Sequence, residues 1–228
     1  MINRLLPLFQ LCDSSLPTGA FSHSFGLETY IQTGAVTDGP SFEEWLVCYV
    51  QEQLAYTDGL VCRMTYDALD SGEMNEIGRL GQLLHIQNLP RETRQGSRMM
   101  GERMLKLTVD LFDLPLLHNY QTLVSDGRTV PHPAIVFTII AYEFGCSREE
   151  AILYYLYSSI SGLVQNAVRA IPLGQTAGQH ILYRFGSVLQ DTVEKILGLS
   201  EDDFGIVAPG LELSQMQHER VNVRIFMS

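Results

Sequence analysis

The 228-residue chain is predicted to be all-α, a single-domain helical bundle, and three observations predict this class. Apolar residues recur at helical spacing along most of the chain. Two S-x-x-E capping boxes, Ser41 with Glu44 and Ser147 with Glu150, mark helix starts. Alternating strands joined by hairpin dipeptides are absent, as are internal repeats and low-complexity linkers. With 46% hydrophobic residues, the chain can fill one sizeable core.

The first half of the chain reads as successive amphipathic helices. Residues 41–56 carry apolar side chains in the i, i+3, i+4 pattern after the first capping box. Residues 73–87 and 91–112 repeat this spacing, and Gly72 and Pro90 are the expected breaks between helices. This half therefore contributes several short helices rather than one long one.

The second half is predicted to be helical as well. Residues 131–145 are rich in β-branched side chains, but a Pro-x-Pro start and a Gly145 stop favour a helix over a strand. Residues 151–168 contain no charge, yet their serines, Gln165 and Asn166 favour a helix buried by its neighbours over a membrane span. A further helix is expected from Thr176 to about Leu197, and a loop at Pro209 and Gly210.

Composition narrows the class of partner. Fifteen basic residues against twenty-six acidic ones give a formal net charge of −11. This charge disfavours nucleic acid and anionic membranes and favours protein partners, including basic ones. The four cysteines are scattered without a C-x-x-C pair, which favours a reducing cytoplasm over a disulfide framework or a zinc ribbon.

The stretch DSSLPTGAFSHSFGLE, Asp13–Glu28, contains several reactive side-chain types. Their spacing is neither that of a catalytic motif nor that of a metal site. Neither Ser22 nor Ser24 lies in the G-x-S-x-G pattern that a serine hydrolase would need. His23 has no histidine or cysteine at ligand spacing, although His132, His218 or other residues distant in the sequence could still converge on it. The local interpretation is a turn at residues 13–19 in which Gly19 adopts a positive φ, followed by a helix capped by Ser22 or Ser24.

A second dense stretch, Asn166–Gln179, contains two glycines but no phosphate loop, since G-x-x-x-x-G-K-[ST] is absent from the chain. Pro172 and Gly174 are expected to end one helix and begin the next. Arg169 then falls in the last turn of the first helix, where a cation suits the helix dipole. Such an arginine can equally anchor a protein interface.

The end of the sequence differs in character from the rest. Residues 218–228, HERVNVRIFMS, alternate apolar side chains at Val221, Val223 and Ile225. We expect an all-helical domain over residues 1–217 and, over residues 218–228, an extended tail that orders when it meets a partner.

Together, the Asp13–Glu28 block, IPLGQTAGQ at Ile171–Gln179 and the final RIFMS resemble the UreF family of urease accessory proteins. The order and spacing of the blocks match along essentially the entire chain, although Ala20 and Phe25 stand where the family often has glycine. The resemblance implies an all-helical, dimeric protein without enzymatic activity or an intrinsic cofactor. It also implies a complex with UreD (UreH in some organisms) and the GTPase UreG, which docks on apo-urease and helps deliver nickel.

The resemblance also implies which residues bind partners. Glu28 and Arg169 are candidates for the surface that engages the GTPase, and Arg224 and Phe226 for the segment that orders against UreD. As an alternative role, Arg169 would enter the GTPase site as an arginine finger and regulate GTP hydrolysis. The full predicted partner-binding set is His23, Glu28, Arg169, Pro172, Gly174, Gln175, His218, Glu219, Arg224 and Phe226.

Overall fold

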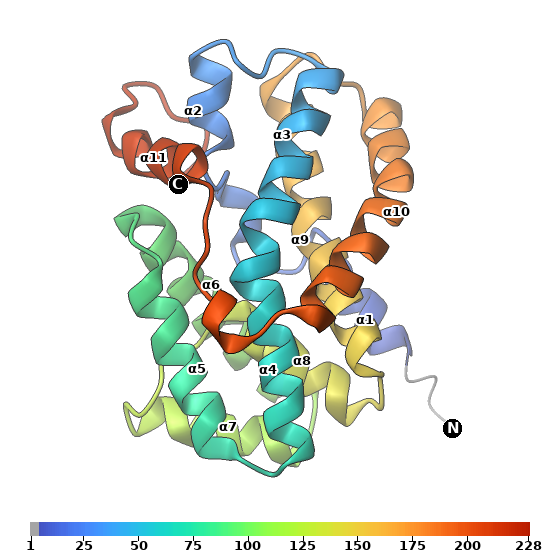
Figure 1. Ribbon diagram of the computed structural model, residues 1–228, viewed down its shortest axis with the longest axis vertical. Coiled ribbons are helices and arrows are strands. Elements are labelled where there is room, and N and C mark those ends of the chain that lie inside the picture. The colour runs from blue at the N-terminus through green and yellow to red at the C-terminus, as the bar shows by residue number, and fades with distance from the viewer. Residues whose placement is uncertain (1–4) are drawn as a thin grey trace.

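A computed structural model describes residues 5–228 and shows an all-α fold, which confirms the predicted class (Figure 1). The first four residues of the predicted 1–217 domain lie outside the described residues. No strand occurs within the described part of the chain. The helices are α1 Leu5–Cys12, α2 Leu27–Gln32, α3 Gly39–Glu52, α4 Asp58–Asp70, α5 Met74–Gln87, α6 Arg91–Leu111, α7 Pro115–Ser125, α8 Pro133–Glu143, α9 Arg148–Ala170, α10 Gln175–Gly198 and α11 Pro209–Gln217. Short 3-10 turns lie at Ala20–Ser22, Leu54–Tyr56, Glu201–Asp203 and His218–Arg220.

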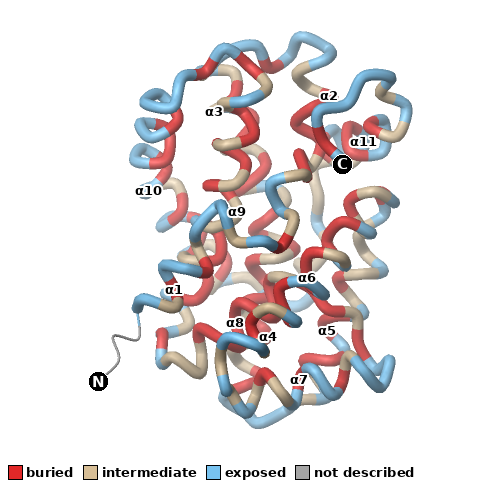
Figure 2. Tube along the Cα trace, turned by 180° about the vertical axis from the view of Figure 1, so that it is seen from behind, coloured by how far each residue is buried: buried red, intermediate tan, exposed pale blue. Residues whose placement is uncertain are grey.

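Helix α8 lies at the centre of the core. All residues from Ala134 to Ala141 are buried, and α4, α6, α7 and α9 pack around them. The outer helices turn apolar faces toward this centre and polar faces outward, which Figure 2 shows as red inner and pale blue outer stretches. The β-branched run therefore forms a buried helix, as predicted, because its Pro-x-Pro start and the positive φ of Gly145 (74°) fix its two ends.

The second predicted capping box is confirmed and the first is wrong. The Ser147 hydroxyl accepts from the Glu150 amide, and the Glu150 carboxylate accepts from the Ser147 amide, at the start of α9. Helix α3 instead begins at Gly39, with Asp38 as its N-cap and Ser41 as the reciprocal partner. Aspartate is as good an N-cap residue as serine, and here Asp38 takes that position. The Ser41 hydroxyl then accepts from the Asp38 amide and forms no capping box with Glu44.

Other predicted boundaries hold within about three residues, with two exceptions. The helix predicted over residues 41–56 ends at Glu52, and Leu54–Tyr56 form a separate 3-10 turn. Gly72 (φ 71°) lies between α4 and α5, and Pro90 is the residue before α6. The loop predicted at Pro209 and Gly210 is wrong, because Pro209 is the first residue of α11. Proline fits that position since the first helical residue donates no intrahelical hydrogen bond.

Helix α9 is buried by its neighbours, as predicted, because α1, α3, α4, α8 and α10 cover it. Within the described residues, no helix combines the length and the apolar character needed to cross a bilayer.

Gly101 on α6 permits a close approach of this helix to the backbone of the loop before α8. A Cβ there would lie 2.4 Å from the carbonyl oxygen of Pro131 and 2.7 Å from the amide nitrogen of His132. We expect Gly101→Ala to lower the free energy of unfolding by about 1–3 kcal/mol, since backbone cannot move aside like a flexible side chain. Gly186→Ala on α10 is the matched control: nothing lies within 4 Å, so a gain of about 1 kcal/mol is expected. Urea unfolding of both variants measures the difference, and equal values would contradict the close approach.

Candidate partner-binding surface

The Asp13–Glu28 block forms the predicted turn. The Asp13 carboxylate accepts from the amide of Ser15 at 2.8 Å, and Gly19 has a φ of 90°. Phe25 also adopts a positive φ, 52°, the only non-glycine residue to do so within the described part of the chain. This is one of the positions where the resembling family often carries glycine, so the sequence keeps the left-handed backbone there without the residue that favours it.

The predicted serine cap of the next helix is wrong. Helix α2 begins after Gly26 (φ 92°), which makes no side-chain cap. Ser24 is turned toward the other end of the chain, where its amide and its hydroxyl both donate to the main-chain oxygen of Ser228 at 2.6 Å. The Ser24 hydroxyl oxygen also lies 3.4 Å from the amide of Glu28. Ser24 thus joins two distant segments: its hydroxyl accepts from the first turn of α2 without being the N-cap and donates to Ser228.

Residues 218–228 lie on the helical body, and we call them the docked segment. The amide of Met227 donates to the carbonyl of Ser22 at 2.7 Å, and the side chains of Phe226 and Ser228 are buried. These contacts hold the segment against its own chain, and its predicted ordering against a partner stays a prediction. The predicted division into domains at residue 217 stays a prediction.

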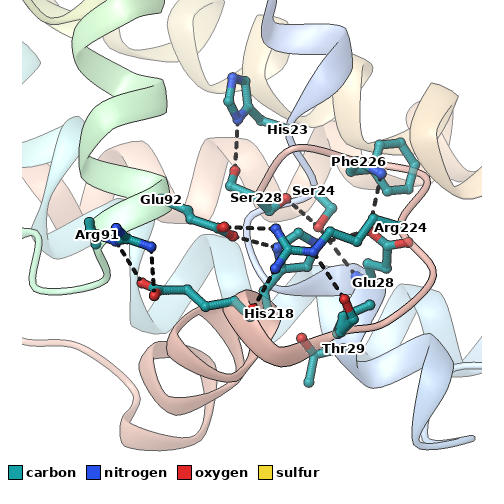
Figure 3. A network of polar contacts seen from close by, with 12 residues as sticks. His23, Ser24, Glu28, Thr29, Arg91, Glu92, His218, Arg224, Phe226 and Ser228 are labelled. Atoms are coloured by element: carbon teal, nitrogen blue, oxygen red, sulfur yellow. Dashed lines mark hydrogen bonds and ion pairs between the residues drawn. The ribbon is translucent and has the colours of Figure 1, made fainter.

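Glu28 is the main anchor of the docked segment (Figure 3). Its side chain is 3% exposed and accepts from the amides of Ile225 at 2.6 Å and Phe226 at 3.1 Å. It also lies 2.8 Å from Nε2 of His218. The two amide donors and the imidazole nitrogen surround this buried carboxylate with polar partners, which offset the cost of burying it.

His218 is fully buried between two carboxylates. Its Nδ1 lies 2.8 Å from Glu92 on α6, opposite the contact of its Nε2 with Glu28. Arg224 also donates to Glu92, at 2.7 Å. Burial opposes ionisation of Glu92, but hydrogen bonds from His218 and Arg224 outweigh it and hold the pKa of this carboxyl below its usual value. The docked segment is therefore fixed by polar contacts of His218 and Arg224 with two carboxylates.

His23 occupies a buried site shaped by its neighbours. Its Nδ1 lies 2.7 Å from the hydroxyl of Ser228, and its carbonyl accepts from the side-chain amide of Asn166 at 2.7 Å. Gly96 on α6 makes room for the ring, because a Cβ there would lie 2.6 Å from the ring carbon Cε1. Burial, and next the nearby guanidinium of Arg103, lower the pKa of His23 to about 4.

The lowered pKa of His23 predicts a loss of stability in mild acid. Above about pH 6.5 the ring is neutral in both the folded and the unfolded chain. As the pH falls from there toward 4, the unfolded chain takes up a proton that the folded chain refuses, so the free energy of unfolding decreases, by on the order of 3 kcal/mol in full. The free energy of unfolding is measured by urea denaturation at several pH values between about 6.5 and 5. It should fall clearly less steeply with decreasing pH for His23→Gln than for the wild type. Equal slopes would assign the effect to other groups.

Arg169 lies in the last turn of α9, as predicted. Its guanidinium stacks 3.3 Å from the ring centroid of Phe21 and 5.1 Å from that of Phe226. It also donates to the carbonyl of Phe21 and to the side-chain oxygen of Asn166. Arg169 thus connects α9, the Asp13–Glu28 block and the docked segment.

The fold brings together seven of the ten residues predicted from the sequence: His23, Glu28, Arg169, His218, Glu219, Arg224 and Phe226. Pro172 and Gly174 lie instead in the turn between α9 and α10, and Gln175 is the first residue of α10. All three are exposed and share no hydrogen bond with this cluster among the described residues. Their role stays a prediction.

Four residues of the cluster were missed by sequence reasoning: Ser24, Glu92, Asn166 and Ser228. Asn166 had a signal, since an amide in a charge-free buried helix needs hydrogen-bond partners. Glu92 had none, because its partners lie more than 120 positions away in the chain.

The cluster does not resemble a hydrolase or a metal centre. His23 bonds to Ser228 rather than to Ser22 or Ser24. His132 lies 3.9 Å from Asp58, on a cavity of about 130 Å³ that His23 also lines. Among residues 5–228, no three His, Cys, Asp or Glu side chains lie close enough to hold a metal ion.

Comparison with known proteins agrees with this interpretation. The UreF family model matches residues 36–186. The urease accessory protein UreF of Bacillus sp. (strain TB-90) is 48% identical over 227 residues, which covers 100% of both chains. The chain belongs to the UreF family. As a UreF-family protein it is a urease accessory protein and not an enzyme. The match to the Bacillus UreF includes the Asp13–Glu28 block and the docked segment, which lie outside the region matched by the UreF family model.

Proposed function

We propose that this UreF-family protein bridges UreD (UreH in some organisms) and the GTPase UreG in a complex that docks on apo-urease and promotes nickel insertion. It acts as a homodimer in the cytoplasm, and the absence of disulfide bonds among the described residues is in keeping with that compartment. Nickel is the cargo of the complex and not a resident cofactor of this chain.

The observation that carries the proposal is the outward row of apolar side chains on the docked segment. Val223, Ile225 and Met227 are 78%, 57% and 55% exposed, whereas Phe226 and Ser228 between and beyond them are buried. The hydrogen bonds of Glu28 already hold this row in place. A preorganised apolar row at the surface is typical of a protein-binding site, because little ordering entropy remains to be lost on association. We assign this row to UreD.

Reconstitution tests the proposal directly. Apo-urease is mixed with UreD, UreG, nickel and GTP, with and without this chain, and urease activity is measured over time. The proposal expects activation that depends on the chain and co-elution of the chain with UreD and UreG. Full activation in its absence would contradict the proposal.

The alternative function, regulation of GTP hydrolysis through Arg169, is favoured by one observation: the guanidinium is at the surface, beside Phe21. To act as an arginine finger, Arg169 would have to leave its contacts with Phe21, Asn166 and Phe226. These contacts favour a role of Arg169 in binding UreG over a role in GTP hydrolysis. Comparison of GTP turnover by UreG with saturating wild type and Arg169→Ala separates the two. A finger predicts a fall of about 10³-fold or more, and docking predicts equal turnover at saturation.

A further inference from the structure

Helix α6 concentrates positive charge in an otherwise acidic protein. Residues 91–106 contain five basic side chains and only two acidic ones, Glu92 and Glu102. This leaves ten basic residues against twenty-four acidic ones in the rest of the sequence. An excess of this kind on one helix is uncommon by chance in a chain with a net charge of −11, and it marks a surface of distinct electrostatic character.

The basic side chains follow the outer face of α6. Arg91, Arg98 and Lys106 are exposed and lie at positions i, i+7 and i+15, which places them in one stripe about 22 Å long. Exposed Arg103 flanks this stripe and lies over Gly19. The opposite face of α6 packs inward against α8, and Figure 2 shows the helix on the near side of the molecule in that view. We call these four residues the basic stripe.

The basic stripe is only partly neutralised. Arg98 pairs with Glu102 at 2.8 Å and Arg91 with Glu219 at 3.0 Å, both at the surface. The side chains of Arg103 and Lys106 form no ion pair or hydrogen bond with any residue in the described part of the chain. The positive charge of α6 also acts on a neighbouring group. Burial is the main cause that lowers the pKa of His85, and the charges of Arg94 and Arg98 lower it further.

The stripe ends beside exposed apolar side chains. Leu89 (57% exposed) and Ile86 (71%) lie at the corner between α5 and α6, next to Arg91. Nucleic acid and anionic lipid would be repelled by the net charge of the whole molecule, and a phosphate backbone offers no apolar group for this corner. A folded protein with carboxylates beside an apolar anchor complements both parts.

We infer that the basic stripe of α6, together with Ile86 and Leu89, is a docking surface for an acidic face of a protein partner. The inference rests on the proposed function, since the partner is one of UreD, UreG or apo-urease. The net charge alone led us to expect basic protein partners. The inference keeps that expectation for most of the surface, but the basic stripe of α6 favours an acidic partner. Carboxylates opposite the stripe would speed encounter and set the orientation of docking.

Charge reversal tests the inference. Lys106→Glu and Arg98→Glu change the stripe, and Arg128→Glu makes the same change at an exposed arginine on the loop between α7 and α8. Binding of each variant to immobilised UreD, UreG and apo-urease is measured at about 50 mM and about 500 mM salt. We expect each stripe variant to slow association with one partner by about tenfold at low salt and by less than about twofold at high salt. Arg128→Glu should bind that partner like the wild type.

Other outcomes would overturn the inference. If stripe variants and Arg128→Glu bind all three proteins equally while wild type still activates urease, the proposed function stands and the stripe is not a docking surface. If Lys106→Glu instead changes the sedimentation of the chain alone, the occupant is a second copy. If it abolishes binding to an RNA oligonucleotide or to phosphatidylserine vesicles, the occupant is not a protein.

Discussion

Glu28→Ala is expected to release the docked segment. The substitution removes the acceptor of the Ile225 and Phe226 amides and leaves His218 with only one of its two carboxylate partners. A buried donor left without its acceptor costs about 1–3 kcal/mol, and two amides lose theirs here, which is more than a short surface segment can compensate. The amides of Ile225 and Phe226 should therefore exchange with solvent at least about 100-fold faster, as 3 kcal/mol corresponds to more than two decades.

Glu219→Ala is the matched control for this effect. Glu219 belongs to the same segment, but its pair with Arg91 at 3.0 Å is at the surface, where such pairs are worth about 1 kcal/mol or less. Hydrogen exchange measured by mass spectrometry on both variants gives the comparison. Unchanged protection of residues 225 and 226 in Glu28→Ala would show that the buried carboxylate is not the anchor.

Substitution of the outward apolar row is expected to abolish UreD binding without unfolding the chain. Val223→Ser, Ile225→Ser and Met227→Ser together remove three exposed side chains and leave Glu28, His218 and Phe226 untouched. If this row holds interface hot spots worth 2 kcal/mol or more, the affinity should fall by about 30-fold or more. The triple variant is a cleaner test than deletion of residues 218–228, which would also leave the Glu28 carboxylate without its buried donors.

Leu6→Ser with Phe9→Ser controls for a general loss of surface hydrophobicity. These side chains are 58% and 66% exposed on α1, which lies well apart from α11 in Figure 1. Isothermal titration of UreD into each variant compares the affinities, and circular dichroism confirms that the helices persist. If both multiple variants bind UreD like the wild type, the docked segment is not the UreD site.

Local signals in the sequence predicted the fold well. Helix ends are set by hydrogen bonds and backbone angles of near neighbours, as at the Ser147 box, the Gly145 stop and the Pro90 break. A short sequence pattern is therefore enough to predict these ends. The error at Ser41 has the same origin. Asp38 and Ser41 on one side, and Ser41 and Glu44 on the other, are equally good local pairs, and pattern alone does not choose between them.

The candidate site was predictable only in part. The alternation in residues 218–228 was visible, but a period of two does not tell which side faces the protein, and Phe226 turned out to be the buried member. The pairing of Glu28 and Glu92 with His218 joins positions 190 and 126 residues apart. Such pairings depend on how the helices pack, which neither charge nor periodicity specifies.

The long sequence separation of these contacts also orders events during folding. His23 meets Ser228 across 205 positions, so closing this loop carries the largest entropy cost in the cluster and follows the packing of the helices between them. A chain still being synthesised can assemble α3 to α9 but cannot yet present the completed surface. The completed surface therefore forms only after residues 218–228 have been synthesised and have packed on the helical body, and partners that recognise the docked segment would bind after that point.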